Sequence, residues 1–136
     1  MDKYLEILYK LAYKSYKIDE IPVGSIVVYK GKIIGKGFNN RQKSHFVCGH
    51  AEINAIKQAE KYLGDWRLND CELYSTLKPC NMCNEVIKSS RISKVYYLID
   101  QDKSSYNADI YEKIAVNNDI SQKIANLMSN FFKKLR

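Results

Sequence analysis

Residues 72–83 read Glu72-Leu73-Tyr74-Ser75-Thr76-Leu77-Lys78-Pro79-Cys80-Asn81-Met82-Cys83. The first six residues predict a β-strand, and Pro79 predicts a helix start, because proline is tolerated in the first turn of a helix. Two cysteines three residues apart lie on one face of such a turn. The positive end of the helix dipole and its free N–H groups favour thiolates there. This stretch therefore predicts a strand that delivers two sulfur ligands at the start of a helix.

The motif His50-Ala51-Glu52 predicts a second helix start. Alanines and isoleucines recur after it at helical spacing, and Gly64 is a typical stop signal. Residues i and i+2 do not face each other within a regular helix. His50 and Glu52 can therefore share one site only if the helix begins at about His50, and this is the arrangement that we expect.

One histidine and two cysteines suit Zn²⁺ and leave a fourth ligand position for water. Zinc lowers the pKa of a bound water from about 15.7 to about 7, which provides hydroxide at neutral pH. A neighbouring carboxylate can take a proton and pass it to a ring nitrogen of a substrate. The two motifs thus predict one zinc ion per chain, held by His50, Cys80 and Cys83, with Glu52 as the proton carrier.

A closed structural zinc site is the alternative interpretation of the same residues. It needs four protein ligands, and Cys48 or His45 could supply the fourth. That arrangement leaves Glu52 and Pro79 without a role. The remaining cysteine, Cys71, opens a predicted strand and is expected to be a small buried residue.

Outside the motifs, the hydrophobic pattern predicts further helices and strands. The expected elements are a helix over about 4–15, a hairpin of strands 23–29 and 33–38, a polar loop over 38–49, a helix from about 50 to the stop at 64, strands over 72–77 and 94–99, a helix over 79–90 and a last helix over about 120–134. Strand-helix-strand crossovers favour parallel pairing. We therefore expect an α/β fold with a three-layer α/β/α architecture around a central mixed sheet.

The size and charge of the chain are those of a single basic domain. Its 136 residues fit one domain, so residues 1–136 are expected to form one unit. Lys and Arg number 22 against 15 Asp and Glu, which gives a net charge of +7. This excess is a mild bias toward polyanions such as nucleic acid, and it fits a lysine-rich surface that only maintains solubility equally well.

The sequence also bears on the compartment. No apolar run approaches the ~18 residues that span a bilayer, and the first residues include acids and lack an apolar core typical of a signal peptide. We therefore expect a cytoplasmic protein without a membrane partner. Four cysteines in that compartment are metal ligands or buried thiols rather than a disulfide framework.

Together the two motifs form the pattern H-x-E followed by P-C-x-x-C, which is the signature of zinc nucleobase deaminases. With this pattern the sequence resembles the bacterial tRNA adenosine deaminases of the cytidine-deaminase-like superfamily, from about residue 21 to residue 103 and faintly at the C-terminus. The other matching stretches are Pro22-Val23-Gly24, Gly37-Phe38-Asn39, Trp66-Arg67-Leu68, Leu73-Tyr74, Thr76-Leu77, Ser90-Arg91-Ile92, Val95-Tyr96, Asp102-Lys103 and the terminal residues 131–136.

The resemblance implies a cytidine-deaminase-like fold, a homodimer with active sites near the subunit interface, and hydrolysis of the wobble adenosine of a tRNA anticodon to inosine. It implies zinc-ligand roles for His50, Cys80 and Cys83. It also implies that Glu52 is the proton shuttle of the reaction.

The same resemblance implies contacts with the substrate. The backbone N–H of Ala51 would bind the flipped base, and Asn39 would hold the edge of the purine. The family's last helix lies near its RNA, so the basic end formed by Lys133, Lys134 and Arg136 is a candidate RNA contact.

Three stretches depart from the family pattern near the rim of the pocket. They are Phe46-Val47-Cys48-Gly49 before the metal histidine, Lys78 before the Pro-Cys pair, and Ser104-Ser105-Tyr106 after the last strand. They leave the zinc chemistry intact and keep a second function open, the deamination of a free nucleobase or nucleoside of the adenine, guanine or cytosine type. A third possibility, from another class, is a catalytically silent nucleic-acid-binding subunit with structural zinc.

Overall fold

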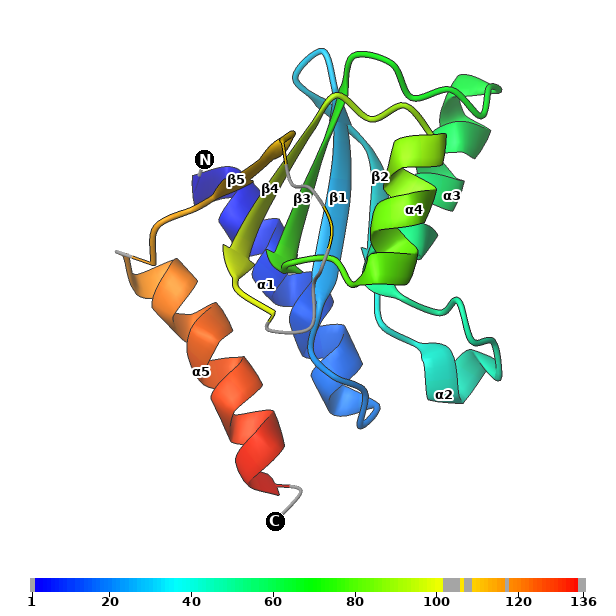
Figure 1. The fold of residues 1–136 in the computed structure, drawn as a ribbon. Helices are drawn as coiled ribbons and strands as arrows, with labels where there is room; N and C mark the ends of the chain where they lie inside the picture. The colour runs from blue at the N-terminus through cyan, green and yellow to red at the C-terminus, as the bar shows by residue number, and fades with distance from the viewer. Residues whose placement is uncertain (1, 102–105, 107–108, 117, 135–136) are drawn as a thin grey trace.

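The computed structural model describes residues 2–101, 106, 109–116 and 118–134 (Figure 1). Its helices are α1 (Asp2–Lys17), α2 (Arg41–Ser44), α3 (Ala51–Leu63), α4 (Asn81–Ser89) and α5 (Asp119–Lys134). Its strands are β1 (Gly24–Tyr29), β2 (Lys32–Phe38), β3 (Cys71–Leu77), β4 (Lys94–Ile99) and β5 (Tyr111–Lys113). Within the described ranges, none of the helices has the length and apolar character needed to cross a membrane.

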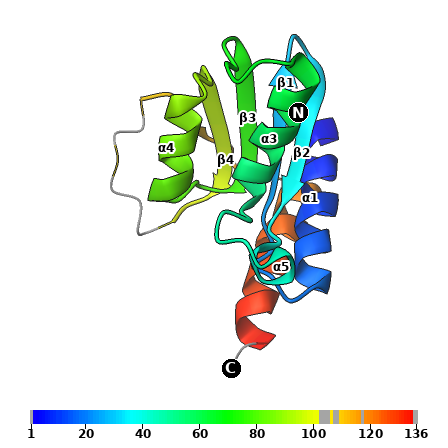
Figure 2. The same cartoon turned by 90° about the vertical axis from the view of Figure 1, so that its right-hand side faces the viewer.

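The five strands form one mixed sheet in the order β2-β1-β3-β4-β5. β1 pairs antiparallel with both β2 and β3, whereas β3 with β4 and β4 with β5 are parallel. The parallel pair β3 and β4 is joined by α4, as expected for a strand-helix-strand crossover. Helices α1 and α5 cover one face of the sheet, and α3 and α4 cover the other (Figures 1 and 2). The predicted three-layer α/β/α fold with a mixed sheet is confirmed.

Each face of the sheet has its own apolar core, because side chains alternate between the two faces along a strand. On β1, Ile26 points to the α1 side and packs with Leu5 and Leu8. The next residue, Val27, points to the opposite side and packs with Ala55 of α3 and other residues of that layer. The central strands are therefore buried on both faces, as parallel-sheet strands with helical cover usually are.

Three details differ from the sequence-based expectation. Helix α2 is a single turn inside the predicted polar loop, and β5 is a three-residue edge strand. Both are too short to show a hydrophobic period. Pro79 lies outside α4, whose N-cap is Cys80 and whose first residue is Asn81. Helix α3 begins at Ala51 with His50 as its N-cap, within one residue of the predicted start.

Helix α3 lies unusually close to β2, and two glycines allow this approach. A Cβ atom added at Gly37 would lie 2.2 Å from the backbone oxygen of Ala51, and one added at Gly35 would lie 2.2 Å from that of Ala55. Neither separation is possible for a real side chain, so only glycine fits. The facing positions on α3 are alanines, and the backbones of helix and strand are in direct contact.

This contact predicts the effect of Gly37→Ala. The added methyl group must push the first turn of α3 away from β2, and overpacking of this kind costs about 1–3 kcal/mol of unfolding free energy. We expect a lower thermal midpoint together with weaker zinc binding, because the displaced turn carries His50 and Glu52. Thermal unfolding and a zinc titration measure the two effects.

The matched control is Gly31→Ala in the β1–β2 turn. A Cβ at Gly31 meets nothing within 4 Å, although its φ of +77° makes the substitution strained. Gly31→Ala should therefore lower stability without changing zinc affinity. Equal loss of zinc affinity in both variants would contradict the proposed link between β2 and the start of α3.

Candidate active site

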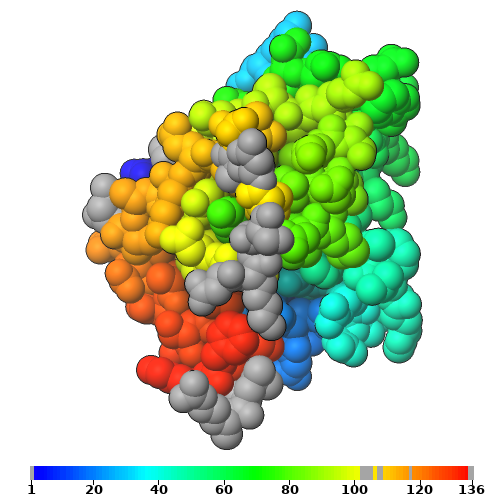
Figure 3. Space-filling view, in the orientation of Figure 1, coloured from blue at the N-terminus to red at the C-terminus, as the bar shows by residue number. Residues whose placement is uncertain are grey.

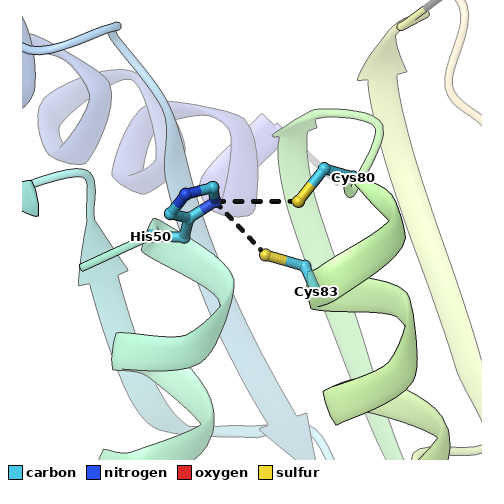
Figure 4. A group of neighbouring side chains, drawn as sticks. All are labelled: His50, Cys80 and Cys83. Atoms are coloured by element: carbon cyan, nitrogen blue, oxygen red, sulfur yellow. Dashed lines mark hydrogen bonds between the residues drawn. The ribbon is translucent and has the colours of Figure 1, made fainter. Parts of the chain in front are cut away.

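Two helix starts meet at one end of the sheet, where the parallel strands β3 and β4 reach their carboxyl ends. His50 is the N-cap of α3 and Cys80 is the N-cap of α4, both with extended backbone. The imidazole of His50 and the thiols of Cys80 and Cys83 point toward one another between the two helices (Figure 4). Open α/β sheets usually bind their ligands beyond the carboxyl ends of their strands.

The spacing of these three side chains fits zinc. His50 Nδ1 lies 3.8 Å from Cys80 Sγ and 3.4 Å from Cys83 Sγ. The donor atoms of the group all lie within 4.8 Å of one another. Tetrahedral zinc with bonds of about 2.0 Å to nitrogen and 2.3 Å to sulfur would separate such donors by about 3.6 Å. Donor chemistry and spacing therefore both suit Zn²⁺.

Only these three residues form the group in the part of the chain that the structure describes. Cys48 and His45, the candidates for a fourth protein ligand, do not belong to this three-residue group. Cys71 is buried at the start of β3, as expected for a packing residue. The arrangement thus has the three-ligand form of a catalytic zinc site, in which the fourth position stays open.

The two thiols of the group differ in acidity. Hydrogen bonds from Cys83 and His50 lower the pKa of Cys80 to about 4. The pKa of Cys83 is raised, because its thiol donates to Cys80 and because it is buried. Cys80 is therefore the more acidic of the two thiols, and binding of a divalent cation by both sulfurs releases the protons that they still carry.

Glu52 lies in the first turn of α3 and is only 4% exposed. Burial disfavours its charged form and raises its pKa to about 7, although the nearby His50 acts in the opposite direction. A carboxyl group with this pKa exchanges protons readily at neutral pH, which is the property required of a general acid and base. It lines a cavity of about 90 Å³ together with His50 and Cys80.

Asn39 lines this cavity and is hydrogen-bonded to Ala51, which is buried behind it. The Ala51 N–H donates to Asn39 Oδ1 at 2.8 Å, and Asn39 Nδ2 donates to the Ile21 carbonyl at 3.0 Å. The two groups that the resemblance assigns to base binding are thus hydrogen-bonded to each other. A base that uses the Ala51 N–H must replace the Asn39 oxygen as its acceptor.

Gln101 is a cavity residue that the sequence analysis missed. Its Nε2 donates to the Lys78 carbonyl at 2.7 Å. Its place two residues after β4, at the carboxyl end of a parallel strand, is the signal that could have identified it.

The Lys78 ammonium lies 5.6 Å from the Tyr97 ring and 5.5 Å from the Tyr106 ring. Residues 104 and 105 of the third departure lie outside the described residues.

The catalytic cavity adjoins a second, outer depression of about 290 Å³. Ile21, Asn39 and His50 line both hollows. Arg41 contributes a positive charge to the outer depression, and Phe132, which is 47% exposed, contributes an aromatic ring. The site thus extends beyond the space around Glu52.

The basic end of α5 is only partly available to a ligand. Lys134 Nζ is paired with Asp19 Oδ1 at 3.0 Å and lies 4.5 Å from the Tyr16 ring. Lys133 is exposed, and Arg136 lies outside the described residues.

Metal analysis of two cysteine variants tests this site. The native chain should contain one zinc per chain, and Cys83→Ser should lose most of it, because a hydroxyl group is a poor replacement for a thiolate. Cys48→Ser is the matched control and should retain zinc. Elemental analysis of the purified proteins measures both. Loss of zinc from Cys48→Ser would instead identify a fourth protein ligand and a closed structural site.

Comparisons with known proteins agree with this geometry. A family model for the cytidine and deoxycytidylate deaminase zinc-binding region matches residues 1–99. A tRNA-specific adenosine deaminase of Streptococcus pyogenes serotype M18 is 36% identical over 138 residues, covering 93% of this chain and 86% of the relative.

Solved structures agree as well. One from studies of A-to-I editing by tRNA:A34 deaminases has a TM-score of 0.74 and 28% identity, and the match covers 83% of this chain and 98% of that structure. A guanine deaminase of Bacillus subtilis has a TM-score of 0.69 and 28% identity, with 95% of this chain and 93% of that chain covered.

The matched region 1–99 contains both helix-start motifs and thus the whole three-residue metal group. The resemblance inferred from the sequence is confirmed: this chain belongs to the cytidine and deoxycytidylate deaminase family of zinc-dependent hydrolases, and within it is similar to the tRNA-specific adenosine deaminases.

Proposed function

We propose that this protein is a zinc-dependent deaminase that converts adenosine to inosine at the wobble position of a tRNA anticodon. Residues 1–136 form its single deaminase domain, with one zinc held by His50, Cys80 and Cys83. The observation that carries the proposal is the buried carboxyl group of Glu52, on the cavity wall beside a three-ligand metal group. A purely structural zinc site has no use for such a proton carrier.

Zinc, when bound by the three side chains, supplies the Lewis acidity that makes water a nucleophile at neutral pH. The protein's own residues then move the protons. Glu52 takes a proton from the attacking water and delivers it to the N1 ring nitrogen of adenine as the C6–O bond forms. It then takes the proton of the new C6 hydroxyl group and delivers it to the 6-amino group, which leaves as ammonia when its bond to C6 breaks. Adenosine and water thus give inosine and ammonia. With a pKa of about 7, the Glu52 carboxyl can perform both transfers without a large energetic cost.

Asn39 and Ala51 are the proposed base-binding groups of this site. The Asn39 carboxamide is oriented by the Ile21 carbonyl and by the Ala51 N–H, and a purine that binds the Ala51 N–H replaces only the second of these bonds. A purine that hydrogen-bonds to the Ala51 N–H and to Asn39 is aligned with its C6 side toward Glu52. Such prior alignment lowers the entropic cost of the reaction.

The outer depression favours a polymeric substrate. A free base needs only the catalytic cavity, whereas a flipped nucleotide has neighbours that must lie beside it. The exposed ring of Phe132 offers stacking for those neighbours, and Arg41 offers a positive charge in a depression that Asp19 and Glu20 also line. The similarity to a tRNA-specific adenosine deaminase supports the same substrate.

We further propose that the protein is cytoplasmic, because its proposed substrate, tRNA, is processed in that compartment. We also propose that it forms a homodimer. Beside a hollow of about 340 Å³ between α3 and α4, the Trp66 side chain is 49% exposed, whereas Ile53 and Ile56 in the lining of this hollow are buried. An exposed tryptophan supports association with a second copy of the chain, because aromatic residues are enriched in protein interfaces.

A free-purine deaminase is the second candidate function. Similarity to the guanine deaminase of Bacillus subtilis, which covers almost the whole chain, specifically favours it. Turnover measured side by side on tRNA, adenosine, adenine, guanine, cytidine and cytosine separates the two candidates. Inosine formation in tRNA alone supports the proposal, and turnover of a free base alone contradicts it.

Replacing Glu52 tests the mechanism. Glu52→Gln preserves the shape of the side chain and removes its ability to carry the proton. Because general acid–base catalysis contributes about 10²–10⁴-fold, kcat should fall by about that factor. Zinc content and the thermal midpoint should stay close to native values, since Glu52 is not a proposed ligand.

Glu6→Gln, at an exposed position of α1 outside the cavity, is the matched control and should leave turnover near the native value. Near-native turnover in Glu52→Gln would remove this residue from the mechanism. Loss of zinc from Glu52→Gln would show that the carboxylate supports the metal instead.

A further inference from the structure

A basic hollow of about 380 Å³ lies where the last turn of α1 meets the end of β2 and helix α2. Lys14 and Lys17 reach it from α1, and Lys43 reaches it from α2. No acidic side chain belongs to its lining among the described residues. In Figure 3 this part of α1, in blue, shows at the surface between α5 in red and α2 in cyan.

The ammonium groups of the hollow are not neutralised by carboxylates. Lys14 Nζ lies 5.8 Å from the centre of the Phe38 ring, and Lys17 Nζ lies 5.5 Å from that of Tyr13. In the described part of the chain, none of the ion pairs includes Lys14, Lys17 or Lys43. Aromatic rings thus hold two of the cations in place, and their charge remains available to an anion.

Two chain segments connect this hollow with the catalytic cavity. In the first segment, Ile21 lines the cavity, residues 19–20 line the outer depression, and residues 17–18 line the basic hollow. In the second segment, Asn39 lines the cavity and the depression, residues 41–42 line the depression, and Phe38, Asn40 and residues 43–44 line the basic hollow. The three hollows are therefore formed by the same pair of segments, and along the first segment they follow one another in order.

Hydrogen bonds hold the two segments side by side. Asn39 Nδ2 donates to the Ile21 carbonyl at 3.0 Å, and the Gln42 N–H donates to the buried carboxylate of Glu20 at 3.0 Å. Of the two acids beside the path, Asp19 is paired with the Lys134 ammonium, whereas Glu20 accepts this backbone hydrogen bond from a neutral donor. These hydrogen bonds fix the two segments that line the path, and the path ends at the three positively charged lysines.

We propose that Lys14, Lys17 and Lys43 bind the phosphate backbone of the RNA strand that leaves the catalytic cavity. The inference rests on the proposed function, because it extends the path of that substrate. When a base is inserted beside Glu52, the phosphates of the neighbouring nucleotides lie in the outer depression and in the basic hollow. In the basic hollow, the three lysines contact these phosphates. This contact recognises the negative charge of the phosphates and does not depend on the base sequence of the RNA.

The experiment compares RNA binding by the native chain with that of a triple variant, Lys14→Gln, Lys17→Gln and Lys43→Gln. The probe is a tRNA anticodon stem-loop, bound to zinc-loaded protein in a Glu52→Gln background that prevents turnover. Each phosphate contact changes the slope of log affinity against log salt by about 0.7 to 1. The triple variant should therefore show a slope flatter by about 2 to 3 and affinity weaker by at least about tenfold at low salt.

The matched control is a second triple variant, Lys30→Gln, Lys61→Gln and Lys88→Gln. It removes the same total charge from exposed positions at the ends of β1, α3 and α4 that lie away from the site. Its slope and affinity should stay within error of the native values. Equal effects in both triple variants would show a response to net charge alone and would overturn the proposal.

The remaining outcomes separate this inference from the proposed function. In one outcome, the native chain and the lysine variant differ in slope as expected while the native chain forms no inosine in tRNA. This result would overturn the proposed function and support the phosphate contact. Inosine formation with unchanged slopes in the lysine variant would overturn the contact alone. Binding of inorganic phosphate that the lysine variant loses, with unchanged RNA slopes, would identify a small-anion site and overturn the RNA contact. Failure of the native chain to bind the stem-loop would overturn both.

Discussion

The direct backbone contact between α3 and β2 is the constraint on which the site depends. Because Gly35 and Gly37 lack side chains, the alanine-lined face of α3 lies on the strand itself, with no layer of side chains between them. The first turn of α3 is thereby fixed against the sheet. Its N-cap, His50, then lies at the same end of the sheet as Cys80, whose position follows from the crossover between β3 and β4. A helix held by larger side chains would place the imidazole farther from the sulfurs.

The electrostatics of the site result from two opposing influences at the helix starts. Hydrogen bonds from the side chains of Cys83 and His50 lower the pKa of Cys80 to about 4, at a helix start, where negative charge is favoured in general. Glu52 occupies the same kind of position, yet burial outweighs the favourable environment and raises its pKa to about 7. The pKa values of Cys80 and Glu52 shift in opposite directions because the two groups differ in exposure and in hydrogen-bond partners, although both lie at a helix start. The start of α4 thus supplies the sulfur ligands, and the start of α3 supplies both the imidazole ligand and the proton carrier.

The local parts of this architecture could be predicted from the sequence. Both helix starts, the strands of the hairpin and the parallel crossover follow from apolar spacing, proline and glycine signals. Helix α2 and strand β5 could not be predicted, because one turn and three residues contain too little of a period. Gln101 was missed for a different reason: a lone polar residue after a strand becomes informative only when the neighbouring strand ends are known. The hydrogen bond between Asn39 and Ala51 was likewise not foreseeable, since the two residues lie in separate elements.

The sequence by itself determined the chemistry: a histidine, two cysteines three residues apart, and a glutamate at a helix start are recognisable because helical geometry relates neighbouring residues directly. Only the tertiary structure decided which of these groups meet. His50 and Cys80 are separated by 30 positions, and their contact at 3.8 Å depends on strand order and on the close packing of α3 against the glycines of β2. The same holds for the path from the cavity to the lysines of α1 and α2, which segments distant in sequence build together. Local patterns specify residue types and helix starts, whereas distances between elements follow from how the sheet is ordered and how tightly its layers pack.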